Sequence, residues 1–359
     1  MNFKSIFAAS ACGILLLPGC KQQPAQPNTD LTVNLKSEDV NCMAYLVNYD
    51  TKEKFDSTIV GSDSVAHFSV FVDQPFIARL LVGDKRRGTF IVEPGTLVRD
   101  TEGNISGSEL NDELQTLTNR IDELYSIASN DSLPVSVRDS ATTVAKTVME
   151  NAVARQDIVG STQLLDFCYE MTATEFDSVL TKYPYYRNFE NVKRMAESKN
   201  AFAATAAGKK FADFSVGDND SIQHFSDYVG KGRYTVVDFW ASWCGPCRRE
   251  MKNLKEIYAA YNGKGLDILG VAVWDKPEDS KKAIEQLGLP WQQILDAQEI
   301  PTKLYGIIGI PHIMVISPEG TILSRNLAGR DLRTFVDSVM TNPTFPVQAA
   351  TTNGEHPAK

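Results

Sequence analysis

The most constraining feature of this chain is a pair of cysteines at the point where a strand pattern gives way to a helix pattern. The apolar run Tyr234–Trp240 predicts a buried strand, and the residues after Cys247, RREMKNLKEIYAAYN, predict a helix. Cys244 and Cys247 therefore stand at the first turn of that helix. Thiols separated by two residues can close a disulfide with little movement of the backbone, so this junction is a candidate redox site.

The position of each cysteine relative to the predicted helix suggests a role for it. At a helix N-terminus, unpaired N–H groups and the macrodipole favour a thiolate over a thiol. A thiolate is the species that attacks a disulfide. Cys247 lies one turn further in, where it is shielded and can attack a mixed disulfide formed on its neighbour. The spacing therefore predicts Cys244 as the nucleophile and Cys247 as the resolving thiol.

A CxxC pair can instead be half of a zinc site, or a purely structural disulfide. Zinc would need two more soft ligands at suitable spacing. The other cysteines are isolated along the chain, and the histidines form no HxxxH or CxxH pattern: His67, His224, His312 and His356. We therefore expect no metal at this motif, and we prefer a redox-active disulfide to a structural one.

Strand and helix patterns alternate from about residue 209 to 342. LDILGVAVW predicts a second buried strand, and PEDSKKAIEQLG predicts a second helix. HIMVISP and TILSRNL predict two strands joined by a turn at Pro318-Glu319-Gly320. Strands alternating with helices predict a sheet with parallel pairs, here closed by an antiparallel hairpin.

Two segments of this region carry a family resemblance. YTVVDFWASWCGPCRRE is very similar to thioredoxin around its active site, and GIIGIPHIMVISPEGTIL resembles the cis-proline segment and closing hairpin of that family. The opening FADFSVGDNDSIQHFSDYVGKGRYTVVDFW looks more like the membrane-tethered TlpA/ResA branch. The resemblance implies a thioredoxin fold and a protein disulfide oxidoreductase that needs no cofactor.

The resemblance assigns further site residues. Asp238 matches the buried carboxylate of thioredoxin, whose pKa is raised by desolvation and which can relay a proton as Cys247 becomes a nucleophile. Pro311 matches the cis-proline, and Ile310 before it would offer backbone hydrogen bonds to a bound peptide. The alternatives are a structural aspartate in a core strand and an ordinary trans turn.

Residues around the motif complete the expected site. Trp243 matches an exposed rim position that can contact partners, while Trp240 is expected to pack in the core. Gly245 and Pro246 form the thioredoxin dipeptide, which resembles reducing rather than strongly oxidising members. We assign five residues to substrate binding: Trp243, Gly245, Pro246, Ile310 and Pro311.

The chain departs from the family pattern near the site. His312 follows Pro311 where threonine is common, and it either tunes the thiolate near neutral pH or is a simple rim residue, which we prefer. The acidic residue that ResA-type proteins carry near the site cannot be assigned by motif. Glu250 and Asp275 are the candidates.

The N-terminus is typical of a targeting segment rather than of part of a fold. Lys4 precedes an apolar run, residues 6–17, that is too short to span a membrane and is typical of a secretory signal peptide. Leu17-Pro18-Gly19-Cys20 resembles a bacterial lipobox, which implies lipidation of Cys20. The alternative is an ordinary signal peptide with an incidental cysteine. We therefore expect a lipid-anchored protein of the bacterial envelope that faces the periplasm.

Between the targeting segment and the thioredoxin-like region, the pattern changes twice. Short runs rich in β-branched and aromatic residues predict a small antiparallel β-sandwich, whereas the following leucine spacing, with Ser108 as a candidate N-cap, predicts a helical bridging segment. The β part more weakly resembles a domain of unknown function found before thioredoxin-like domains in Bacteroidetes lipoproteins. The expected boundaries are 1–19 signal peptide, 20–30 tether, 31–105 β-sandwich, 106–205 helices, 206–343 thioredoxin-like domain and 344–359 disordered tail.

Charge and cysteine use limit the classes of function. The formal net charge is −9, which argues against a nucleic-acid binder. Cys42 and Cys168 are expected to be buried and inert, with an interdomain disulfide as the alternative. We expect an envelope reductase of protein disulfides, with apocytochrome c among its candidate substrates and a membrane electron donor that restores the dithiol.

Two other classes of function stay open. One is a peroxiredoxin-like peroxide reductase, but the PxxxTxxC setting that such an enzyme needs is missing before Cys244. The other is a partner-binding lipoprotein in which the β and helical parts bind and the thioredoxin-like domain is secondary.

Overall fold

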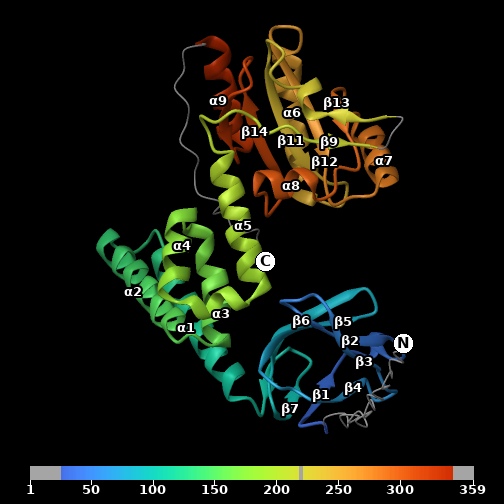
Figure 1. Cartoon of the computed structure of the whole chain (residues 1–359), viewed down its shortest axis with the longest axis vertical. Coiled ribbons are helices and arrows are strands. Elements are labelled where there is room, and N and C mark those ends of the chain that lie inside the picture. The colour runs from blue at the N-terminus through green and yellow to red at the C-terminus, as the bar shows by residue number, and fades with distance from the viewer. Residues whose placement is uncertain (1–25, 218–220, 343–359) are drawn as a thin grey trace, which may run out of the picture. The chain divides into compact units, whose positions relative to one another are not determined.

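The computed structural model describes residues 26–217 and 221–342 (Figure 1). The predicted signal peptide, lipidated Cys20 and tail 344–359 lie outside these residues. The described residues form two compact units. One holds the residues up to Val47 together with Lys54–Asn111, and the other holds Asn48–Glu53 and the residues from Asp112 onward.

The first unit is a β-sandwich. Its two four-stranded sheets have the strand orders β4-β1-β7-β8 and β3-β2-β5-β6. The strands are β1 (Thr29–Asn34), β2 (Met43–Asn48), β3 (Lys54–Ile59), β4 (Val65–Val70), β5 (Phe76–Val82), β6 (Lys85–Val92), β7 (Gly95–Arg99) and β8 (Ile105–Ser106). Alternate residues of both sheets, such as Leu31 and Leu46, are buried in one shared core.

One pair of strands in the sandwich is parallel, although the sequence predicts an antiparallel arrangement. β1 and β7 run in the same direction, with Thr29 opposite Gly95 and Val33 opposite Arg99. Two strands joined by a short turn must run antiparallel, whereas two strands joined by a long connection can pair in either direction. The chain between β1 and β7 carries strands of both sheets, so adjacency along the sequence does not set the direction of this pair.

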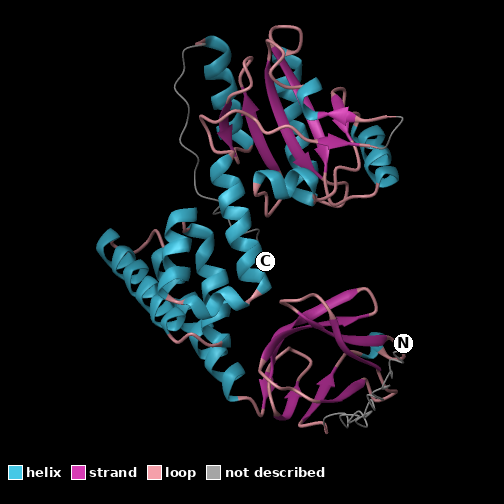
Figure 2. Cartoon of the chain, viewed as in Figure 1, coloured by secondary structure: helices cyan, strands magenta, loops and turns pink. Residues whose placement is uncertain are grey.

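From Asp112 onward, the second unit starts with a helical segment, as the leucine spacing predicts (Figure 2). Its helices are α1 (Glu109–Ala128), α2 (Val135–Ala154), α3 (Ile158–Phe167), α4 (Ala173–Lys182) and α5 (Glu190–Ala204). The N-cap prediction is confirmed, because the Asn111 amide donates to Ser108 Oγ at 3.1 Å. Thr172 and Glu175 form a capping box that starts α4. These helices pack around a small core that contains Leu164, Phe176 and Tyr186.

The rest of the second unit has a thioredoxin fold. Its main sheet has the order β13-β12-β11-β14-β15, with β11, β12 and β13 parallel and the closing β14–β15 hairpin antiparallel. The elements are β9 (Ser215–Val216), β10 (Gln223–His224), β11 (Tyr234–Trp240), α6 (Gly245–Tyr261), β12 (Leu266–Ala272), α7 (Pro277–Leu287), β13 (Gln292–Ile294), α8 (Ile300–Tyr305), β14 (His312–Ile316), β15 (Ile322–Arg325) and α9 (Gly329–Thr341).

Each face of this sheet has its own core. Val236 and Trp240 of β11 pack with α6, α7 and α9, whereas Val237 and Phe239 pack with α8 and the segment around Phe225. This division follows from the alternation of side chains along a strand. Since Asp238 lies between Val236 and Trp240 in this alternation, its carboxyl group faces the same side as α6.

Helix α5 is packed directly on α8, so the helical segment and the thioredoxin fold share an interface inside the second unit (Figure 1). Gly306, which ends α8 at φ 62°, shows how close this contact is. A Cβ atom at this position would lie 2.0 Å from the Ser198 carbonyl oxygen and 2.6 Å from the Phe202 amide nitrogen. Within the described part of the chain, no helix is long and apolar enough to cross a membrane.

Candidate active site

Cys244 and Cys247 form a disulfide at the junction between β11 and α6, with their Cα atoms 5.3 Å apart. Cys244 is the N-cap of α6, and its Sγ accepts a hydrogen bond from the Cys247 amide at 3.1 Å. This amide is one of the unpaired donors of the first helical turn. In the dithiol form the same donor would stabilise a thiolate on Cys244.

The two sulfur-bearing residues differ in exposure. Cys244 retains 4% of its surface, whereas Cys247 retains none. An incoming disulfide can therefore reach only Cys244 from the surface. In the described residues no group of three or more His, Cys, Asp or Glu side chains is placed to hold a metal ion.

Asp238 of β11 is buried on the face of the sheet that α6 covers, and its carboxyl group has no hydrogen-bond partner and a raised pKa. Neither carboxyl oxygen has a hydrogen-bond partner, and the residue has no exposed surface. Desolvation, helped by the negative charge of Glu250, raises the pKa of Asp238 to about 8. An ordinary structural aspartate would be satisfied by hydrogen bonds, which this one is not.

The two acidic candidates near the motif occupy different positions. Glu250 lies on α6, accepts a hydrogen bond from the Gly329 amide at 2.9 Å and raises the pKa of Asp238. Asp275 accepts from the amide and hydroxyl of Ser242 and from the hydroxyl of Ser280, at 2.7 to 3.0 Å. Glu250 therefore acts on the buried carboxyl, and Asp275 fixes the loop that leads into Cys244.

The Ile310–Pro311 peptide bond is cis and lies beside the disulfide. The carbonyl oxygen of Ile310 is 3.7 Å from Cys244 Sγ. On the same surface, Trp243 is 62% exposed, and its indole N–H donates to the carbonyl oxygen of Trp274 at 2.9 Å. Gly245 and Pro246 are exposed, whereas Trp240 is buried and donates to Gln293. The structure thus brings the sequence-predicted site residues together at one edge of the sheet.

Comparison with known proteins agrees with this geometry. The sequence profile of the AhpC/TSA family matches residues 207–325. The thiol-disulfide oxidoreductase ResA of Geobacillus thermodenitrificans is 30% identical over 161 residues, which cover 44% of this chain and 86% of ResA. The chain belongs to the ResA family of thiol-disulfide oxidoreductases.

Other relatives share this region. The thiol:disulfide interchange protein HelX of Rhodobacter capsulatus is 29% identical over 154 residues, which cover 42% of this chain and 82% of HelX. The crystal structure of the thioredoxin domain of a thiol-disulfide oxidoreductase from Bacteroides vulgatus is 33% identical, with a TM-score of 0.34. That alignment covers 38% of this chain and 98% of the Bacteroides domain.

His312 lies in the core of this ResA-family chain, and the expectation of a rim position is wrong. It is 4% exposed in β14, and its Nε2 accepts hydrogen bonds from the guanidinium of Arg325 at 3.1 and 3.3 Å. Burial and the positive charge of Arg325 hold the pKa of His312 well below its usual value. The ring therefore stays neutral near pH 7, and His312 does not provide a charge that titrates there.

Arg325 is a residue that the sequence analysis missed. It is 2% exposed, and its guanidinium donates to the carbonyl oxygens of Phe202, Thr205 and Tyr305 at 2.7 to 3.2 Å. It thereby ties the C-terminal ends of α5 and α8 to the strand pair that follows Pro311. Its signal in the sequence is weak, because an arginine in a closing strand is normally a solvent-exposed residue.

Cys42 and Cys168 are free in the structure, which does not form the interdomain disulfide considered as an alternative. Cys168 is fully buried, and desolvation raises the pKa of its thiol to about 12. Such a thiol is not a nucleophile at neutral pH. Cys42, which we expected to be buried, is only partly buried against the sandwich core.

Proposed function

We propose that this ResA-family chain reduces protein disulfides by dithiol exchange on the periplasmic side of the bacterial envelope. The observation that carries the proposal is the combination of a helix-capping Cys244, a buried Cys247 and an unsatisfied buried carboxyl on one face of the sheet. Each of these groups has a place in the exchange of two electrons between thiols and a disulfide.

The exchange begins from the dithiol form. The Cys244 thiolate attacks one sulfur of the substrate disulfide, which forms a mixed disulfide and releases the first substrate thiolate to take a proton from water. The Cys247 thiol then transfers its proton to the carboxylate form of Asp238. With a pKa of about 8, this carboxyl is a stronger base than an ordinary aspartate and can accept the proton near neutral pH.

The second step closes the disulfide that the structure shows. The Cys247 thiolate attacks Cys244 Sγ and releases the second substrate thiolate, which is then protonated. Two electrons have passed to the substrate, and the chain has gone from dithiol to disulfide. A thiol donor in the membrane must return two electrons before the next cycle.

Substrate and location follow from less direct observations. The Gly245-Pro246 dipeptide supports the reducing direction, and the lipobox-like Leu17–Cys20 supports a lipid anchor. We propose disulfide-containing envelope proteins as substrates, with the haem-binding cysteines of apocytochrome c among the candidates. Trp243, Ile310 and Pro311 would bind the substrate segment around its disulfide.

Reduction of insulin by the full mature chain, with dithiothreitol as electron source, tests the activity. The wild type should turn over, and Cys244→Ser should lose the activity. A wild type without turnover would overturn the reductase proposal, and consumption of hydrogen peroxide at a comparable rate would favour the peroxidase alternative. Cys247→Ser, expressed in cells, should trap substrates on Cys244, and their identity would test the envelope proposal.

A further inference from the structure

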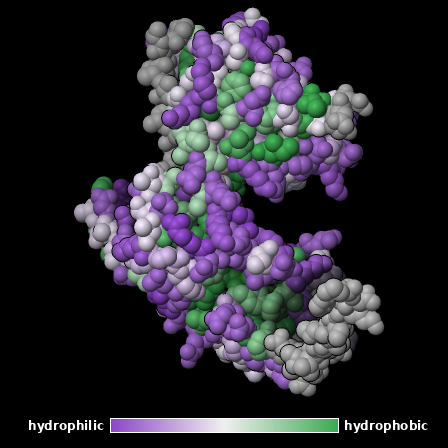
Figure 3. Space-filling model, in the orientation of Figure 1, coloured by the Kyte–Doolittle hydropathy of each residue, from purple (hydrophilic) through white to green (hydrophobic). Residues whose placement is uncertain are grey.

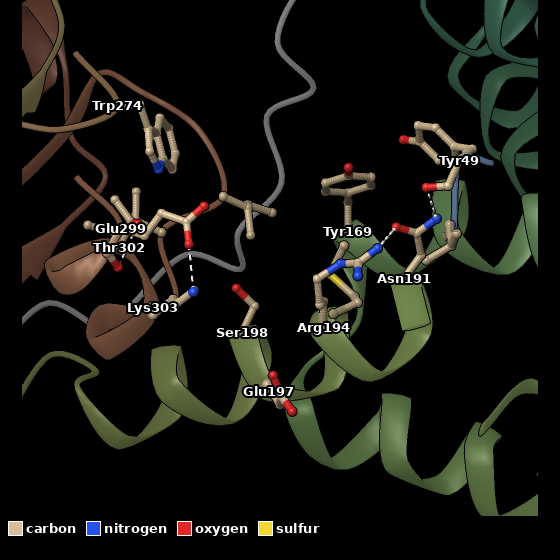
Figure 4. A pocket seen from close by; sticks show the side chains of 14 residues that line it. Tyr49, Tyr169, Asn191, Arg194, Glu197, Ser198, Trp274, Glu299, Thr302 and Lys303 are labelled. Carbon is tan, nitrogen blue, oxygen red and sulfur yellow. Dashed lines mark hydrogen bonds and ion pairs between the residues drawn. The ribbon is translucent and has the colours of Figure 1, made fainter. Parts of the chain in front are cut away.

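A cavity of about 400 Å³ lies inside the second unit, between the helical segment and the thioredoxin fold (Figure 4). Trp274, Glu299, Thr302 and Lys303 line one side, and Tyr169 and Arg194 lie on the opposite side. A cavity of this size lies within the range of small-ligand pockets, so it can hold a large side chain and part of its backbone.

The lining of the cavity favours an uncharged, apolar occupant. Leu165, Met195, Ile307 and Ile308 add apolar surface to the rings of Trp274 and Tyr169. The charges of Glu299 and Lys303 are paired with each other at 2.6 Å, and Arg194 and Glu197 add one charge of each sign, so the lining carries no net charge that would attract an ion. Figure 3 shows hydrophobic residues gathered on the thioredoxin fold over α8, where Ile300 and Ile308 are among the exposed large hydrophobic residues.

Two residues that line the cavity, Trp274 and Ile308, also adjoin residues of the redox site. Trp274 lines the cavity with its ring and accepts the indole N–H of Trp243 with its carbonyl oxygen. Ile308 also lines the cavity and lies two residues before Ile310, whose carbonyl oxygen is 3.7 Å from Cys244 Sγ. At about 3.3 Å per extended residue, a peptide paired with Ile310 would reach the cavity within two to four residues.

Trp274 is held in an unfavourable backbone conformation. Its φ is 53°, in the left-handed region that bulky residues rarely adopt. The anchoring of Asp275 by Ser242 and Ser280 holds this part of the chain in place. Strain of this kind persists where the surroundings over-determine it, and it is common at ligand-binding positions.

We propose that this cavity binds an apolar side chain, preferably aromatic, that lies two to four residues from the attacked cysteine in the substrate. This inference rests on the proposed reductase function and names its substrate class more narrowly. The helical segment then forms one wall of the substrate site, and specificity comes from α5 and the chain around Tyr169 as well as from the thioredoxin fold.

Short peptides test the proposal on the full mature chain. Each carries one cysteine in a mixed disulfide with 5-thio-2-nitrobenzoate, and the chain is first reduced to its dithiol form, so its attack on the peptide cysteine releases a coloured thiol. Phenylalanine or serine is placed at each position from two to four residues on either side of the cysteine. The wild type should prefer phenylalanine at one or more of these positions by about tenfold or more in kcat/KM, the range expected for an apolar pocket.

Two substitutions on the same helix separate the cavity from the active site. Ser198 lines the cavity, and Ser198→Tyr should fill it and remove the preference for phenylalanine. Asn200 is exposed on α5 and is not part of the lining, so Asn200→Tyr should keep the preference. Tyr169→Ala removes one wall without adding bulk, and it should weaken the preference even if Ser198→Tyr folds poorly. None of these changes should alter reduction of the small disulfide 5,5′-dithiobis(2-nitrobenzoate).

The outcomes distinguish this inference from the proposed function. A wild type that reduces the small disulfide and all peptides without preference would overturn the cavity proposal and leave the reductase function standing. The cavity proposal also fails if Ser198→Tyr and Tyr169→Ala both keep the wild-type preference. A wild type that reduces none of these disulfides would overturn the reductase function, and the cavity proposal with it.

Discussion

Asp238 makes the stability of the fold depend on pH in the opposite direction to a salt-bridged aspartate. Its pKa is about 8 in the folded chain, against about 3.9 in an unfolded one. Between these values the unfolded state releases the proton while the folded state keeps it, so stability falls as the pH rises. We expect Asp238→Asn to raise the free energy of unfolding at pH 7 by up to about 4 kcal/mol, the value that these two pKa values imply.

Urea denaturation at pH 5 and pH 8 checks this prediction. The stabilisation by Asp238→Asn should be larger at pH 8, because the wild type loses more stability there by keeping a proton that the unfolded chain releases. Asp331→Asn changes an exposed carboxylate of α9 and should show no such difference. An equal gain at both pH values would mean that Asp238 does not keep its proton in the folded chain.

Glu250 gives a second prediction, because its charge contributes to the raised pKa of Asp238. Glu250→Gln removes the charge but keeps an oxygen that can accept from the Gly329 amide. The pKa of Asp238 should fall, and the pH midpoint of insulin reduction should move to lower pH. Glu256→Gln, on an exposed part of α6, serves as the control, and identical pH profiles for the two variants would contradict the coupling.

Among the secondary-structure elements, the contact between α5 and α8 depends on one glycine. Gly306 and Gly288 both end a helix at positive φ, 62° and 55°. A Cβ at Gly306 would overlap the Ser198 carbonyl, whereas at Gly288 the nearest atom is Lys255 Nζ at 3.9 Å. We expect Gly288→Ala to cost about 1 kcal/mol, the strain of a Cβ at positive φ, and Gly306→Ala about 3 kcal/mol or more. Thermal unfolding of the two variants measures the difference, and equal losses would show that the interface can relax.

Secondary-structure elements that depend on neighbouring residues could be predicted from the sequence, whereas contacts between distant segments could not. Local periodicity and turn residues predicted the strand before Cys244, the helix after it and the β14–β15 hairpin, because each of these depends on neighbouring residues. The burial of His312 was missed because it depends on Arg325, thirteen residues later, and on Phe202 in another part of the chain. The direction of β1 beside β7 and the cavity beside the redox site likewise depend on segments that are distant in sequence.

At the scale of the whole molecule, Arg325 connects parts that the sequence analysis assigned to separate domains. The predicted boundary at residue 206 would cut α5 away from the thioredoxin fold. The acceptors that Phe202 and Thr205 offer to Arg325 would then be lost, while those on Tyr305 and His312 would stay. Because a buried guanidinium without acceptors is costly, α5 should stabilise the thioredoxin fold.

Two fragments test this dependence. Residues 190–342 keep α5, and residues 206–342 lack it. We expect the longer fragment to unfold at a temperature higher by about 8 °C, as a difference of about 2 kcal/mol implies for a domain of this size. When Arg325→Met is introduced into both fragments, the difference between their unfolding temperatures should decrease, because methionine does not need the hydrogen-bond acceptors on α5. If Arg325→Met leaves this difference in unfolding temperature unchanged, the stabilisation comes from apolar packing between α5 and α8 rather than from the buried arginine.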